Sequence, residues 1–246
     1  MKAFLEKIGG EWLDDFVYIS KYPLSDRGYT IVPFDGDDME NTLLNKHITK
    51  DDMCVGSVQA TTKFFEIAGV KTPESITYPT ELDPFLGRTI KMRMLGDITS
   101  KSLPLFIKPA SEIKKFTGDV FKTQSHLDNL KYFDGCNEKT VIWTSTLLEF
   151  ETEYRVFVSN GVIYGMKHYQ GDYAKMVDIE EVKKMIATYK SCPSAYTLDV
   201  GLTANGETKL VEVNDMWAIG SYGLEGRDYS LLCARRMKEI MNQNGK

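Results

Sequence analysis

The sequence predicts an α+β protein whose C-terminal half consists mainly of antiparallel hairpins. Two Asn-Gly pairs, at 160–161 and 205–206, each separate two strand-like runs, a pattern typical of hairpins with a type I′ turn. Segments with apolar residues at helical spacing lie before, between and after these hairpins. The chain has 246 residues and is 42% hydrophobic and 26% charged, which suits a folded protein of one compact unit or two small lobes.

In the first half of the chain, short strand-like runs alternate with residues that interrupt regular secondary structure. A helix is expected over 55–69, because Val58, Phe64 and Phe65 belong to an apolar helical pattern that ends in a glycine. The DGDD sequence at 35–38 predicts a loop. The strands expected in this half are 16–20, 29–34, 88–95 and 104–110.

The second half shows clearer patterns. A helix over 178–191 begins at Asp178 with a D-x-x-E capping pattern and stops before Pro193. A last helix carries apolar residues from Leu231 to Met241. The strand-like segments of this half are 139–150 and the hairpins 153–159/162–169 and 196–203/207–215.

Composition excludes several classes of protein. A formal charge of −5 argues against binding of nucleic acid as the main activity, because that needs clustered Lys and Arg. No apolar run reaches the length of a membrane span, and the first residues do not form a secretion signal, so we expect a cytoplasmic protein with no membrane partner. The four cysteines are expected to be free thiols, and they are Cys54, Cys136, Cys192 and Cys233.

The second hairpin carries the most informative side chains. If the second Asn-Gly pair forms a two-residue loop, Ala204 lies opposite Glu207 and Asp199 lies opposite Glu212. Asn214 then follows two residues further along the same face. Two carboxylates and an amide oxygen on one face suit a hard divalent cation. The alternative is an exposed strand face on which these side chains are simply hydrated.

The register of the first hairpin decides which basic residues share a face. With the first Asn-Gly pair as its loop, Glu153 faces His168 and Tyr154 faces Lys167. Arg155 then shares the face of Glu153, whereas Lys167 points the other way. A bulge in the hairpin would reverse the prediction for Lys167.

Four segments in this order resemble the motifs of ATP-grasp enzymes. The pair Asp199-Val200 and 210–214 resembles the strands that hold the Mg²⁺ bridging the ATP phosphates in that family. The other three segments resemble the phosphate-binding strand at 105–109, the mobile phosphate-covering loop at 114–118, and the adenine hinge with its following strand at 147–158. The resemblance covers about residues 29–240. It is strongest to a divergent clade containing the eukaryotic cell-division-cycle protein that assembles a translation initiation factor, with phage and bacterial relatives.

This resemblance implies an ATP-grasp fold, in which two α/β lobes hold ATP between antiparallel sheets. We expect a small N-terminal α/β domain over 1–95 and a nucleotide-binding and catalytic domain over 96–246. The lobes of the second domain are expected at about 96–150 and 151–246.

The resemblance also implies roles for individual residues, with ATP and Mg²⁺ as the bound groups. Arg155 would contact a phosphoryl or acyl-phosphate oxygen, and Lys175, ranked ahead of Lys167, would contact the γ-phosphate. The remaining implied contacts are phosphate for Lys108 and Lys115, adenine for Phe150 and Glu149, ribose for Glu153, and Mg²⁺ for Asp199, Glu212 and Asn214.

The implied activity is that of a ligase, which activates a carboxylate as an acyl phosphate and joins it to an amine or similar nucleophile, with a protein or peptide as the preferred substrate class. Many such ligases carry an arginine where this chain has Thr197, and this departure favours a second hypothesis, an ATP-binding assembly factor without turnover. A small-molecule kinase is a third. The segment 215–222 differs from the usual acceptor-side turn, so the motifs do not define the acceptor.

Overall fold

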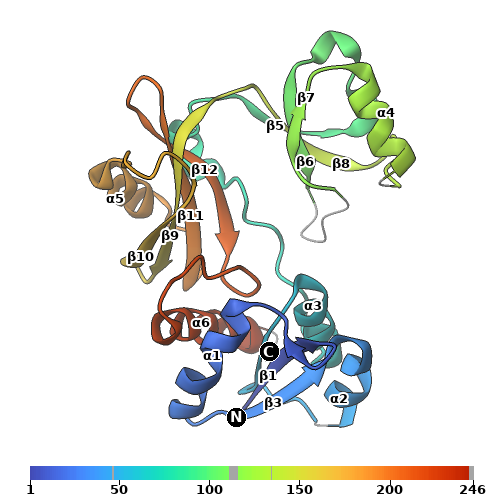
Figure 1. The fold of residues 1–246 in the computed structure, drawn as a ribbon, viewed down its shortest axis with the longest axis vertical. Coiled ribbons are helices and arrows are strands. Elements are labelled where there is room, and N and C mark those ends of the chain that lie inside the picture. The colour runs from blue at the N-terminus through green and yellow to red at the C-terminus, as the bar shows by residue number, and fades with distance from the viewer. Residues whose placement is uncertain (46, 111–115, 134, 244–246) are drawn as a thin grey trace.

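The computed structural model describes residues 1–45, 47–110, 116–133 and 135–243, which form three four-stranded sheets that follow one another along the chain (Figure 1). Each sheet has its own cluster of buried apolar side chains. The first sheet lies at the bottom of Figure 1, the second at the upper right and the third at the upper left.

The N-terminal sheet is built around β1, which pairs in parallel with β3 and β4. Its strands are β1 (Lys2–Ile8), β2 (Glu11–Trp12), β3 (Thr30–Asp35) and β4 (Met53–Val55). Its helices are α1 (Asp15–Asp26), α2 (Met39–Asn45) and α3 (Val58–Ile67). The strand expected over 29–34 and the helix expected over 55–69 are therefore confirmed, as β3 and α3.

The strand predicted over 16–20 is wrong, because these residues lie inside α1. Their run of aromatic and β-branched side chains is typical of a strand. The helix nevertheless buries Phe16, Val17 and Leu24 on one face, and Asp14 caps its first turn by accepting a hydrogen bond from the Asp15 backbone (2.7 Å). The loop predicted at 35–38 contains a short 3-10 helix, Gly36–Asp38.

The C-terminal helix α6 (Gly226–Gln243) packs beside α1 and closes the N-terminal core (Figure 1). Leu232, Met237 and Ile240 belong to the same buried cluster as Phe4 and Phe64 of the N-terminal unit. The last helix was thus predicted correctly, but its packing partner lies at the other end of the chain. The domain limits at 1–95 and 96–246 stay a prediction.

The middle sheet has the order β5-β8-β6-β7 and is antiparallel throughout. Helix α4 (Gln124–Phe133) contributes Leu127 and Leu130 to its core. The strands are β5 (Ile90–Met94), β6 (Leu105–Pro109), β7 (Asp119–Phe121) and β8 (Val141–Ser145). The strands expected over 88–95 and 104–110 are confirmed, and the strand-rich segment 139–150 contains β8 and ends where the next sheet begins.

The C-terminal sheet has the order β10-β9-β11-β12, so the two predicted hairpins are confirmed and lie side by side. Helix α5 (Ile179–Thr188) buries Val182 and Met185 against it. The strands are β9 (Phe150–Ser159), β10 (Val162–Gly171), β11 (Ala195–Thr203) and β12 (Thr208–Asp215). All four cysteines are free. None of the helices in the described part of the chain has the length and apolar character needed to cross a membrane.

Candidate functional site

In the second hairpin Asp199 lies directly opposite Glu212, as predicted. The predicted route to this register is wrong, because the backbone N–H of Thr203, rather than that of Ala204, pairs with Glu207 (2.9 Å to its carbonyl oxygen). The loop is therefore one residue longer than expected, and a bulge directly after Asp199 restores the register. The longer loop and the bulge each shift the pairing by one residue, and the two shifts cancel at the Asp199–Glu212 pair.

In the first hairpin two bulges in β10 overturn the predicted register. Lys167 lies opposite Arg155 and His168 lies opposite Tyr154, so the predicted pairs Glu153/His168 and Tyr154/Lys167 are wrong. The shifts fall between Ile163 and Gly165 and between His168 and Gln170. Because directly opposed residues share a face, Lys167 lies on the face of Arg155.

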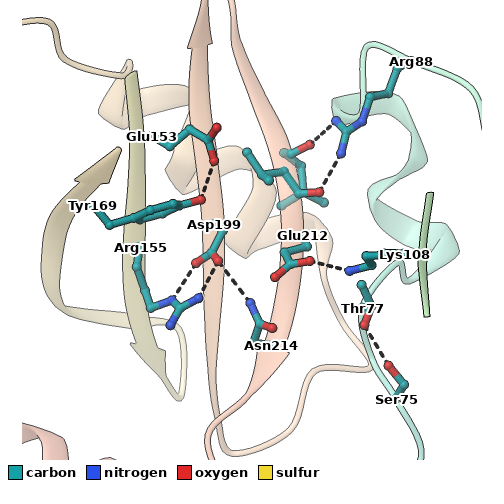
Figure 2. Close-up of polar contacts among 12 residues, drawn as sticks. Ser75, Thr77, Arg88, Lys108, Glu153, Arg155, Tyr169, Asp199, Glu212 and Asn214 are labelled. Atoms are coloured by element: carbon teal, nitrogen blue, oxygen red, sulfur yellow. Dashed lines mark hydrogen bonds and ion pairs between the residues drawn. The ribbon is translucent and has the colours of Figure 1, made fainter. Parts of the chain in front are cut away.

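Arg155 and Asp199 form a buried, two-pronged ion pair at the centre of the C-terminal sheet (Figure 2). Nε and Nη2 of Arg155 donate to the two carboxylate oxygens of Asp199 at 2.8 and 2.6 Å. Nδ2 of Asn214 donates to Oδ2 of the same carboxylate at 3.2 Å. Burial raises the pKa of Asp199 to about 6; Arg155 opposes this effect, and the carboxylates of Glu212 and Glu153 add to it.

Lys108 of β6 reaches across from the middle sheet and forms an ion pair with Glu212 of β12 (Figure 2). Its ammonium also lies 4.7 Å from the centre of the Tyr78 ring. Burial by itself lowers the pKa of Lys108, but Glu212 and Tyr78 together more than offset this effect, so the pKa is raised. The predicted phosphate-binding lysine therefore lies against a predicted metal ligand on the opposing sheet.

Arg88 is a site residue that none of the sequence motifs includes. Its Nη1 donates to the carbonyl oxygen of Leu210 (2.6 Å) and its Nη2 to that of Val211 (2.6 Å), so the segment before β5 is tied to β12 (Figure 2). Its guanidinium carbon lies 5.7 Å from the centre of the Phe150 ring. Burial lowers the pKa of Arg88. Only the contact between distant segments reveals its role.

Two tyrosines were also absent from the sequence prediction. The hydroxyl of Tyr169 donates to Glu153 (2.5 Å), and the ring of Tyr169 stacks on that of Tyr222 with centroids 5.3 Å apart. Burial raises the pKa of both Glu153 and Tyr169. Tyr169 belongs to the second bulge of β10, so periodicity alone could not assign its face.

The other predicted residues lie around this centre. Phe150 begins β9, and its ring occupies the space that a side chain at position 201 would need. Lys175 pairs with Glu151 at 2.7 Å. Glu149 is exposed, in the stretch between β8 and β9. Lys115 lies outside the described residues, so its predicted role stays a prediction.

The donor chemistry of the centre fits Mg²⁺. Among the residues described, no three His, Cys, Asp or Glu side chains form a metal cluster. The predicted set consists of two carboxylates and one amide, however, and Mg²⁺ prefers such oxygen ligands. In this structure Arg155 and Lys108 balance the charges of Asp199 and Glu212. A bound cation would therefore share the two carboxylates with Arg155 and Lys108, or take the place of these basic residues.

An antiparallel sheet that carries an acidic pair faces a second sheet that carries a lysine. The family match and the structural similarities reported below show that this is an ATP-grasp fold, as predicted. The chain belongs to the ATP-grasp domain family named R2K clade family 2, whose model matches residues 85–232. No curated protein sequence is significantly similar to this chain.

Solved structures of ATP-grasp proteins match the whole fold at low identity. D-alanine–D-alanine ligase from Bacillus anthracis complexed with ATP is 12% identical, with a TM-score of 0.57 over 100% of this chain and 99% of that chain. D-cycloserine synthetase DcsG is 9% identical, with a TM-score of 0.62 over 96% and 100%. The macrocyclase MdnC, bound with precursor peptide MdnA from Microcystis aeruginosa MRC, is 9% identical, with a TM-score of 0.50 over 94% and 99%. These similarities establish the fold alone.

Proposed function

We propose that the protein is an ATP-dependent carboxylate–amine ligase that releases ADP and acts in the cytoplasm. The observation that carries the proposal is the opposition of Asp199, Glu212 and Asn214 on one sheet to Lys108 on the other. Membership of an ATP-grasp family and structural similarity to ligases support it.

In this proposal each residue neutralises or orients part of ATP. Mg²⁺, held by the two carboxylates and Asn214, would screen the phosphate charges and orient the phosphates. Lys108 would exchange Glu212 for a phosphate oxygen when ATP binds, since both are anionic oxygen acceptors. Lys115, which lies outside the described residues, is also proposed to contact phosphate. Phe150 and Glu149 are proposed to line the adenine site, and Glu153 to accept the ribose hydroxyls.

The reaction proceeds by two displacements. The substrate carboxylate attacks the γ-phosphorus, ADP leaves, and an acyl phosphate forms. An amine then attacks the acyl carbon, losing a proton, and phosphate leaves. Arg155 would bind the transferred phosphoryl oxygens, supplying from β9 the guanidinium that Thr197 of β11 lacks. Lys167, opposite Arg155, is favoured over Lys175, which pairs with Glu151, for the γ-phosphate contact.

The proposed substrate class is a protein or peptide. The structure of MdnC contains a precursor peptide, and that of the ATP-grasp ligase PsnB contains a minimal precursor. Both are similar in fold to this chain, which makes peptides the first substrates to test. No nucleic acid or membrane partner is part of the proposal.

The second candidate is an ATP-binding assembly factor without turnover. It is favoured by the motif resemblance to the clade that contains the translation-initiation-factor assembly protein. Thr197, buried on β11 opposite Asn214, cannot supply the charge of the arginine that many ligases carry there.

One experiment separates the two candidates. The protein is incubated with ATP, Mg²⁺ and a mixture of amino acids and peptides, and ADP and product masses are measured. ADP release coupled to a condensation product supports the ligase, whereas tight ATP binding without ADP release supports the assembly factor. ADP with a phosphorylated small molecule would identify a kinase instead. Glu212→Gln serves as the inactive control.

A further inference from the structure

Tyr222 lies on the segment between β12 and α6, to which the sequence motifs assign no role, and its ring covers Arg155. The ring centroid is 4.4 Å from the guanidinium carbon, and the ring stacks on Tyr169 with an interplanar angle of 18°. The backbone of Tyr222 has a φ of +44°, a conformation that is uncommon for a tyrosine. The local fold thus holds this ring over the guanidinium in spite of an unfavourable backbone.

The contacts of Arg155 leave one part of its guanidinium for a ligand. Nε and Nη2 are directed to Asp199, and Tyr222 covers one face of the group. Within the described residues, Nη1 donates no hydrogen bond. A guanidinium fixed along one edge and over one face presents its remaining donor in a limited range of directions, which favours an oriented anion contact.

The exposure of Tyr222 indicates that its ring does more than fill the protein core. Tyr222 is 49% exposed, whereas Asp199 and Arg155 beneath it are buried. Tyr222 therefore lies between this ion pair and solvent. Through its stack with Tyr169, whose hydroxyl binds Glu153, the ring also connects Arg155 to the proposed ribose contact.

We propose that Tyr222 is a positioning residue that holds the Arg155 guanidinium so that Nη1 meets the terminal phosphoryl group of ATP. The inference rests on the proposed function, because it needs ATP at this site. Tyr222 acts through Arg155 by cation–aromatic attraction, which requires a ring but not the hydroxyl group. Phenylalanine at this position should therefore preserve the effect.

The test compares ATP with ADP. Affinities of the full chain for ATP and for ADP, both with Mg²⁺, are measured by calorimetry, and their ratio is the readout. Tyr222→Leu should lower the ATP/ADP affinity ratio by about three- to tenfold, as expected for loss of a partly exposed cation–aromatic contact. Tyr222→Phe should stay within about twofold of the wild type. General destabilisation of the protein would weaken the binding of ATP and of ADP alike and leave the affinity ratio unchanged.

Three further variants make the test specific. Tyr222→Asn also removes the ring and suits a left-handed backbone, so it replaces the leucine variant if that one does not fold. Tyr22→Leu is the matched control, since the exposed Tyr22 ring lies 5.0 Å from the ammonium of Lys21 in a cation–aromatic contact on α1. In an Arg155→Lys background, Tyr222→Leu should change the ratio by less than in the wild type, because the two residues act as a unit.

The outcomes are distinguishable. A wild type that binds nucleotide, with an unchanged ratio in both ringless variants, overturns the positioning role and leaves the proposed function standing. An equal fall in Tyr222→Phe also overturns it, since the hydroxyl would then be responsible. A wild type that binds neither nucleotide overturns the proposed function, and this inference with it.

Discussion

Replacing Asp199 by Asn should destabilise the fold far more than replacing Glu212 by Gln, although both residues are proposed metal ligands. Asp199 is 2% exposed, and its two oxygens bind the buried guanidinium of Arg155. Removing its charge leaves Arg155 buried without a counter-ion, a change that typically costs 3–5 kcal/mol. Because Asn keeps one acceptor oxygen, we expect a loss of about 3 kcal/mol for Asp199→Asn.

Glu212 lies in a wetter environment. Its side chain is 20% exposed and that of its partner Lys108 is 14% exposed, so water can replace part of the lost interaction. We expect Glu212→Gln to cost about 1 kcal/mol, the upper end for solvent-accessible ion pairs. Removing both members of the buried pair, with Asp199→Leu and Arg155→Met together, should cost less than the sum of the single changes because no charge is left unpaired.

The assay is urea unfolding followed by far-ultraviolet circular dichroism, without nucleotide or metal, so that only the fold is measured. The free energy of unfolding is compared among the wild type, Asp199→Asn, Glu212→Gln, the single variants Asp199→Leu and Arg155→Met, and the double variant that combines these last two. Equal small losses for Asp199→Asn and Glu212→Gln would refute the argument from burial. Additive losses in the double variant would refute the coupling between Asp199 and Arg155.

Four further predictions follow from the site. Glu212→Gln should remove the Mg²⁺-dependent part of ATP affinity in calorimetry, so that EDTA weakens ATP binding by the wild type but not by the variant. Lys108→Met should weaken ATP binding by at least about tenfold, as loss of a charge-assisted hydrogen bond implies, with Lys101→Met as control; equal affinities would contradict the phosphate role. Arg88→Met should lower the free energy of unfolding by about 2 kcal/mol, since hydrogen bonds from a half-buried charged group to β12 carbonyls are lost, and unchanged urea midpoints would contradict it. Gly201→Ala should cost about 1–3 kcal/mol, because its Cβ would lie 2.3 Å from the Phe150 ring, measured in the same unfolding assay.

Local patterns predicted the C-terminal sheet well because the relevant signals are short-range. Asn-Gly turns and period-two alternation define a hairpin within some twenty residues of sequence. They do not reveal bulges, which depend on the packing of neighbouring strands. Lys167 was therefore assigned to the wrong face. Asp199 was assigned to the right one only because the longer loop and the bulge compensate each other.

The N-terminal unit was predicted less well for the opposite reason. Its central strand β1 pairs in parallel with β3 and β4, so its partners lie far along the sequence. No local turn signal marks such a strand, and β1 was not predicted. The residues 16–20 have strand-like propensity, but packing against the sheet and α6 stabilises a helix there.

By itself, the sequence determined the chemistry of the site: an acidic pair with an amide on one hairpin, a lysine strand before it, and the ATP-grasp class that these motifs resemble. These features depend on residue type and short spacing. The tertiary structure alone decided which charges meet, with Arg155 on Asp199, Lys108 on Glu212, Arg88 on β12 and Tyr222 over Arg155. Such contacts join separate strands, loops and sheets, and their geometry depends on how whole sheets pack, which no local pattern encodes.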